Sequence, residues 1–201
     1  MMRLQDLKIV FVSPDHNEKY QERTRHMKEL LSSIGCKNVT HYKSSTERYP
    51  RCLSEATIDI LEQNMDNPVL IIEDDVEFTG FEMFDFVEHA DAIYFGLSKS
   101  AGHPTENRDL GYSFFAHYSD TQVRVMNMLT THAILYISRQ YKQAVIDVLK
   151  THLFGVFYND VLISRLQPNY LVLANKKPSF YQSARFNTTD HEERWTKWEI
   201  P

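Results

Sequence analysis

The chain of 201 residues has few of the residues that mark specialised classes of protein. Its two cysteines, Cys36 and Cys52, are too few for a disulfide framework and lack the spacing of a metal-binding motif. Six glycines and seven prolines leave no low-complexity linker, and no apolar run approaches the roughly 20 residues that span a bilayer. The first six residues are too polar for a signal peptide. We therefore expect a cytoplasmic protein with reduced thiols and no membrane span.

Basic residues are also in short supply, because 22 lysines and arginines stand against 27 aspartates and glutamates, for a formal net charge of −5. This balance argues against nucleic acid as a partner, although a local basic pocket for one nucleotide is compatible with it. Hydrophobic residues make up 42% of the chain, enough for an ordinary core. We expect one domain over residues 1–201, either alone or as one domain of a longer protein.

The most informative stretch is 68–78, where a run of branched apolar residues leads into Glu73, Asp74 and Asp75. Such a run is typical of a strand buried on both faces. Three adjacent carboxylates repel one another and lose hydration unless a cation or hydrogen-bond donors compensate them. Mg²⁺ or Mn²⁺ is the natural partner of such oxygen ligands. The alternative is a strand that runs into a solvated acidic turn.

Around this strand, apolar strands alternate with helical patterns, which predicts an α/β fold with a mixed, mostly parallel central sheet of about six strands flanked by helices. Ser54 and Ser138 are suitable helix caps, and 81–89 reads as a short helix. Residues 97–120 lose periodicity and suggest a functional loop. The further predicted elements are strands at 7–12, 38–42, 91–96, 129–137 and 171–174 and a helix over 17–34.

Five stretches together resemble the GT-A class of nucleotide-sugar glycosyltransferases, which has a Rossmann-like fold, and within that class the family 25 type. They occur in the family's order and cover residues 7 to about 183: Arg51–Ser54, Ile71–Asp75, Asp91–Gly96, Thr131–Ser138 and Asn159–Asp160. The chain is also similar to glycosyltransferase domains encoded by large DNA viruses, which would place it in a host cytoplasm. Arg51 and Glu55 depart from the glycine and histidine that the family often has.

The resemblance implies a UDP-sugar donor and a Mn²⁺ or Mg²⁺ cofactor. Asp75 would hold the metal against the diphosphate, with Asp74 or Glu73 as second ligand and His191 as a further candidate. The departing diphosphate carries the negative charge that such a metal stabilises. The donor is expected over the ends of the first strands, near Ser13, Pro14 and Ser44, with charge-assisted contacts from Arg51 or Lys177.

The resemblance also implies a general base if the anomeric centre inverts. Asp160 is the first candidate, and its alternative role is that of a helix N-terminal cap. His132 ranks below Asp160, because a histidine on an apolar strand is more often a satisfied core residue. The hypothesis is a metal-dependent glycosyltransferase that moves a hexose or deoxyhexose to a hydroxyl of a glycan or glycoprotein acceptor. The alternative is a catalytically inactive nucleotide- or glycan-binding module of the same fold.

Overall fold

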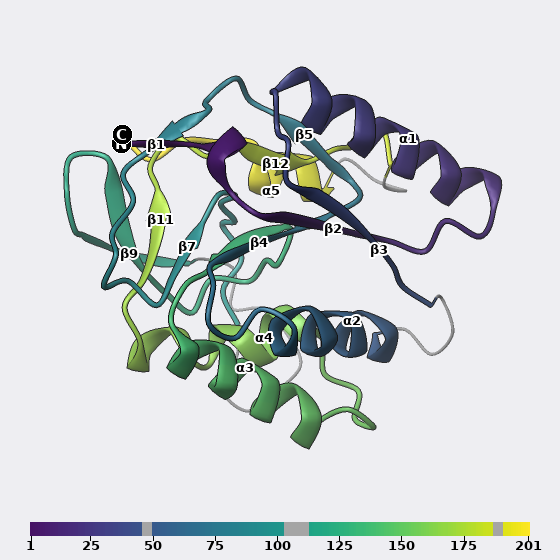
Figure 1. Ribbon diagram of the computed structural model, residues 1–201. Coiled ribbons are helices and arrows are strands. Elements are labelled where there is room, and N and C mark those ends of the chain that lie inside the picture. Colours follow the sequence, from purple (N-terminus) through teal and green to yellow (C-terminus); the bar gives the residue numbers. More distant parts are fainter. Residues whose placement is uncertain (46–49, 103–112, 187–190) are drawn as a thin grey trace.

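The computed structural model describes residues 1–45, 50–102, 113–186 and 191–201, without the side chains of His191 and Glu192. Its centre is an eight-stranded sheet with the order β3-β2-β4-β10-β7-β11-β9-β8 (Figure 1). The strands of this sheet are β2 (Ile9–Ser13), β3 (Val39–Lys43), β4 (Val69–Glu73), β7 (Ala92–Tyr94), β8 (Phe114–His117), β9 (Gln122–Met126), β10 (Ala133–Tyr136) and β11 (Val172–Asn175). Two small ribbons add β1 (Met2–Arg3) with β6 (Met83–Phe84) and β5 (Val76–Phe78) with β12 (Phe180–Gln182).

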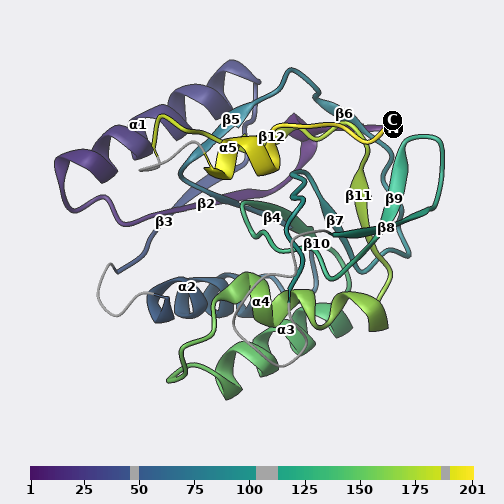
Figure 2. The ribbon, with the colours of Figure 1, turned by 180° about the vertical axis from the view of Figure 1, so that it is seen from behind.

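Helices cover both faces of the sheet. In Figures 1 and 2, α1 and α5 lie on one face, and α2, α3 and α4 lie on the other. The helices are α1 (Glu18–Ser33), α2 (Arg51–Glu62), α3 (Arg139–Thr151), α4 (Asn159–Ser164) and α5 (His191–Thr196), with 3-10 turns at Leu4–Asp6 and Gln167–Asn169. Within the described residues, no helix combines the length and apolar character that a membrane crossing requires.

The core forms because strand residues alternate between these two helical layers. In β4, Val69 and Ile71 pack toward α2 and α3, whereas Leu70 and Ile72 pack toward α1. The same alternation holds in the neighbouring strands, so the sheet is buried on both faces. The apolar run before Glu73 is therefore the buried central strand that its sequence predicts.

The predicted mixed, mostly parallel sheet is confirmed, with more strands than expected. β3, β2, β4, β7, β11 and β8 run in one direction, and β10 and β9 run in the other. The two additional strands of this sheet, β8 and β9, form an antiparallel hairpin at one edge. The prediction of a loop over 97–120 is wrong for β8, which is a strand. Because β8 lies at the edge of the sheet, its residues are half exposed and show no clear alternation of apolar and polar residues.

Two further local predictions are wrong. The segment 81–89 contains β6 rather than a helix, because its backbone pairs with β1 and the amide of Leu4 donates to the carbonyl of Glu82. Ser54 does not cap α2, which begins three residues earlier with Pro50 as its N-cap. Ser138 does cap α3, since its hydroxyl accepts a hydrogen bond from the amide of Tyr141. Gly35 ends α1 at φ +84°, as a C′ glycine does.

Candidate functional site

A cavity of about 300 Å³ lies where β2, β3 and β4 end, between α1 and α2. Its position at the carboxyl edge of parallel strands is the usual place for a ligand in an open α/β sheet. The walls combine apolar, hydroxyl, basic and acidic groups. They come from Val12, Pro14, Tyr20, Arg23, Ser44, Ser45, Cys52, Leu53, Glu73, Asp74 and Asp75. We call this the donor cavity, because the family resemblance implies a nucleotide-sugar donor at these strand ends.

A second cavity of about 140 Å³ shares Leu53 and Glu73 with the donor cavity. Its other walls come from the start of α2, the segment before β10, the start of α4 and β12. These residues are Pro50, Thr130, Thr131, Tyr158, Asn159, Asp160 and Gln182. We call it the acidic cavity, because Glu73 and Asp160 both line it.

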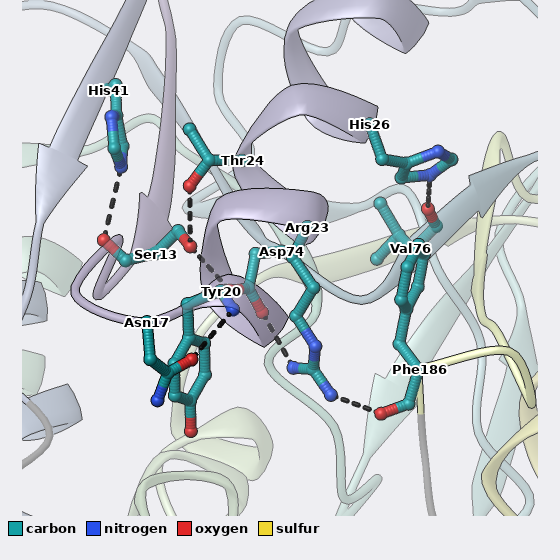
Figure 3. A network of polar contacts seen from close by, with 10 residues as sticks. All are labelled: Ser13, Asn17, Tyr20, Arg23, Thr24, His26, His41, Asp74, Val76 and Phe186. Carbon is teal, nitrogen blue, oxygen red and sulfur yellow. Dashed lines mark hydrogen bonds and ion pairs between the residues drawn. The ribbon is translucent and has the colours of Figure 1, made fainter.

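Asp74 belongs to a buried polar network that joins β2, α1 and β4 (Figure 3). Its Oδ1 accepts from the Arg23 guanidinium at 2.9 Å, and its Oδ2 accepts from the Ser13 hydroxyl at 2.6 Å. Thr24 in turn donates to Ser13 at 3.0 Å. The Asp74 carboxylate is therefore bonded to both Ser13 and Arg23, and the guanidinium compensates its buried charge.

Arg23 also connects the segment after β12 to this site. A second guanidinium nitrogen donates to the carbonyl of Phe186, and the guanidinium carbon lies 5.7 Å from the centre of the Phe186 ring (Figure 3). Three residues earlier in the chain, the amide of Ser183 donates to the carbonyl of Asp75 at 2.8 Å. The segment after β12 is thus held against the turn that carries the acidic residues.

Glu73 is the last residue of β4, and it stands between the two cavities. Its Oε1 accepts a hydrogen bond from the Thr131 hydroxyl at 2.5 Å. The pKa of Glu73 is raised to about 8, first by burial and then by the negative charge of Asp75, with smaller contributions from Asp160 and Asp74. The hydrogen bond from Thr131 acts in the opposite direction. A bound cation would relieve the electrostatic repulsion among these carboxylates.

A hard divalent ion fits this donor set of carboxylate oxygens, with Glu73 and Asp75 as the two candidate ligands. Among the side chains that the structure describes, no group of three or more His, Cys, Asp or Glu residues is arranged to hold a metal ion. From the described residues alone, such an ion would need further ligands from a bound molecule or from water.

Asp160 lies in the first turn of α4, and its Oδ1 accepts from the amide of Val161 at 2.8 Å. Its neighbour Asn159 is buried and accepts a hydrogen bond of 2.5 Å from the Ser54 hydroxyl. The side-chain amide of Asn159 also donates a hydrogen bond of 3.5 Å to the Thr57 hydroxyl. These contacts anchor the start of α4 on α2 and set where Asp160 stands.

The structure brings together Ser13, Pro14, Ser44, Glu73, Asp74, Asp75 and Asp160 at the two cavities, with Ser13 behind the donor-cavity wall. It does not bring Lys177 there, because Lys177 lies beside Phe81 in a cavity that shares no lining residue with either. Arg51 lines neither cavity. Its Nε lies 2.7 Å from Glu55, and its guanidinium stacks on Phe154.

His132 is fully buried, and burial lowers the pKa of its imidazole to about 4. Its ring contacts Thr130 and the carbonyl of Phe180 rather than either cavity. This position favours the core role over the catalytic one. The side chain of His191, the proposed further metal ligand, lies outside the described part of the chain.

Sequence reasoning gave no site role to Tyr20, Thr131 or Asn159. Thr131 and Asn159 are the first residues of two stretches that carry the family resemblance, which was the available signal. Tyr20 follows the helix cap Asn17 by three residues, and nothing in its local sequence separates it from a surface aromatic.

No protein-family model matches the chain, and no curated protein matches it significantly. The solved structures that are similar at low identity include the following three. CTP:phosphocholine cytidylyltransferase from Streptococcus pneumoniae has a TM-score of 0.45 and 11% identity over 92% of this chain and 96% of that chain. A nucleoside-diphosphate-sugar pyrophosphorylase from Vibrio cholerae has a TM-score of 0.42 and 13% identity over 82% of this chain and 70% of that chain. UTP-bound UGPase from Acinetobacter baumannii has a TM-score of 0.38 and 12% identity over 83% and 64%. Likeness this distant says nothing about the activity of this chain.

Proposed function

We propose that the protein is a metal-dependent glycosyltransferase that uses a UDP-sugar and transfers the sugar to a hydroxyl of a glycan or glycoprotein. The observation that carries the proposal is the pair of adjoining cavities that share Glu73. Transfer between two substrates needs two binding spaces that meet at the reacting atoms. The donor cavity suits a nucleotide, and the acidic cavity suits the acceptor.

In the donor cavity, the base and ribose would lie against Pro14 and Tyr20, with the Ser44 hydroxyl within the same wall. The diphosphate would extend toward Glu73 and Asp75. Arg23 lines this cavity as well, so its guanidinium adds positive potential beside the phosphates while it remains paired with Asp74.

Glu73 and Asp75 would hold Mn²⁺ or Mg²⁺, which supplies electrostatic stabilisation of the departing diphosphate. In the reaction, an acceptor oxygen attacks the anomeric carbon and its proton moves to the Asp160 carboxylate. The bond from the anomeric carbon to the diphosphate oxygen breaks, and UDP leaves with the electron pair. This role of Asp160 belongs to an inverting transfer, in which attack and departure would occur on opposite sides of the anomeric carbon.

The first test is isothermal titration of UDP into the protein with Mn²⁺ and, separately, with a chelator. We expect micromolar binding that requires both the metal and Asp75, so that Asp75→Ala abolishes it. Asp66→Ala is the matched control, because Asp66 is an exposed acid that pairs with Arg139 and lines neither cavity. Turnover is then measured with a set of UDP-sugars.

The outcomes separate the candidate functions. UDP binding followed by sugar transfer supports the transferase, and binding without turnover supports the inactive binding module. Absence of UDP binding under both conditions removes the donor assignment. Formation of a nucleotide sugar from UTP and a sugar phosphate, without glycosyl transfer, would replace the proposal by nucleotidyl transfer.

A further inference from the structure

Arg23 is a nearly enclosed part of the donor-cavity wall, and few groups set its orientation. Its side chain is 11% exposed and lines the cavity. One guanidinium nitrogen, Nη1, donates to Asp74 at 2.9 Å, and the other, Nη2, donates to the backbone carbonyl of Phe186. The buried Nε has no hydrogen-bond partner among the residues that the structure describes. The plane of the guanidinium therefore depends on Asp74 and on Phe186.

The Phe186 ring adds a second contact to the same guanidinium. Its centre lies 5.7 Å from the guanidinium carbon, within the range of a cation–π interaction. The Tyr20 ring lies at the same distance, and Figure 3 shows the guanidinium between Tyr20 and Phe186. Tyr20 lines the donor cavity and Phe186 does not. Phe186 thus supports a residue of the cavity wall without being part of the wall.

Phe186 is itself held by contacts other than those with Arg23. Its side chain is buried, and its ring centre lies 4.8 Å from that of His26. The preceding residue, Arg185, pairs with Glu22 of α1 at 2.8 Å. These contacts fix the segment on α1, so Phe186 can serve as a support for the guanidinium.

We propose that Phe186 is a positioning residue of the donor cavity. Its carbonyl and its ring hold the Arg23 guanidinium in one orientation, which keeps the positive charge at the cavity wall beside the bound donor. The ion pair with Asp74 alone would leave this long side chain free to turn about a single contact. The identity of the donor as a nucleoside diphosphate rests on the proposed function, whereas the support of Arg23 by Phe186 does not.

The first test needs no ligand. Phenylglyoxal modifies accessible guanidinium groups, and mass spectrometry of the whole protein follows the modification of Arg23. We expect Phe186→Ala to accelerate this modification at least about threefold, because the guanidinium loses one cation–π contact and the ring that covers it. Phe186→Tyr retains an aromatic ring and should restore the wild-type rate.

Phe84→Ala is the matched control for a general loosening of the fold. Phe84 is 4% exposed against 7% for Phe186, and it packs on Phe95 rather than on an arginine. Its replacement should leave the rate of Arg23 modification unchanged. Thermal unfolding of each variant sets a temperature at which all of them are folded.

The second test measures the binding of UDP in the presence of Mn²⁺ by isothermal titration. Phe186→Ala should raise the dissociation constant for UDP at least about threefold, since Arg23 is then held less firmly beside the diphosphate. Phe186→Tyr and Phe84→Ala should bind UDP as the wild type does.

The outcomes separate this proposal from the proposed function. Equal rates of Arg23 modification in the wild type and Phe186→Ala would overturn it, and so would equal acceleration in Phe84→Ala. Equal UDP affinity of the wild type and Phe186→Ala would overturn it as well, because the orientation of Arg23 would then not affect the donor. A wild type that binds no UDP removes the proposed function, while faster Arg23 modification in Phe186→Ala alone would still establish the positioning of Arg23.

Discussion

The imidazole of His132 fills the space beside Gly96, where a Cβ atom would lie 1.7 Å from its Nε2. Nε2 is 3.4 Å from the carbonyl of Phe180, and Nδ1 contacts the Thr130 hydroxyl. These contacts fit a neutral ring that donates through Nε2 and accepts through Nδ1. The ring therefore connects the residues before β10 to β12, through a gap that only a glycine at 96 leaves open.

Replacing this glycine should destabilise the protein. Gly96→Ala is expected to lower the free energy of unfolding by about 1–3 kcal/mol, because the methyl group and the ring compete for the same space. Urea denaturation measures the loss. In Gly96→Ala/His132→Ala the clash is removed, so the double variant should be more stable than the sum of the two single changes predicts. Simple additivity would contradict direct packing of the pair.

Arg23 should matter more for stability than any exposed arginine. Arg23→Met leaves the Asp74 carboxylate buried without its partner, and we expect a loss of about 3–5 kcal/mol in the free energy of unfolding. Arg139→Met, which breaks an exposed pair with Asp66, should cost no more than about 1 kcal/mol. Equal losses from the two changes in chemical denaturation would show that the Arg23–Asp74 pair is not structurally important.

The buried Lys142 should make the folded protein more stable as the pH rises. Its ammonium group is buried and donates to the carbonyls of Asn64 at 2.8 Å and Asn67 at 2.6 Å. Burial lowers the pKa of Lys142 from 10.5 to about 8. Between these two values the unfolded chain binds the proton and the folded protein releases it, so unfolding becomes less favourable as pH rises.

This contribution is present above pH 10.5 and is lost as the pH falls through about 8. The measurement is the difference in unfolding free energy between wild type and Lys142→Met, since other titrating groups cancel in it. That difference should increase by at most about 1.4 kcal/mol per pH unit across the window. A difference that does not vary with pH would mean that the folded protein keeps the Lys142 proton.

The two cysteines provide an internal test of the donor cavity. Cys52 lines the cavity, whereas Cys36 is half-buried elsewhere at the end of α1. Burial raises the pKa of both thiols, so alkylation should be slow at each. UDP with Mn²⁺ should slow the alkylation of Cys52 severalfold and leave Cys36 unchanged, as followed by mass spectrometry. Equal protection of both thiols would point to a general effect on the fold instead.

Asn159 should affect transfer more than donor binding. Asn159→Ala removes the contact with Ser54 that anchors the start of α4, so Asp160 is held less firmly. We expect kcat to fall at least about tenfold while the affinity for UDP is unchanged. Asn64→Ala is the control, because Asn64 is a buried asparagine at the other end of α2 that donates to Ile60. A parallel loss in both variants would reflect stability alone.

Much of the fold could be predicted because burial leaves a local periodic trace. The run before Glu73 reads as a doubly buried strand, and α1 is bounded by the cap Asn17 and by Gly35. Segments without that trace are predicted wrongly. β8 is a half-exposed edge strand, and β6 exists only because β1 pairs with it.

The order of amino acids alone places three carboxylates after a buried strand and an aspartate at the start of a later helix. The way the chain packs selects which of these carboxylates share a cavity. Asp74 is compensated by Arg23 from α1, whereas Glu73 faces Asp75 and Asp160 across the cavities. Lys177 and Arg51, plausible by charge alone, have other partners. The physical reason is that periodicity records whether a residue is buried, while the identity of its neighbours depends on how distant segments pack.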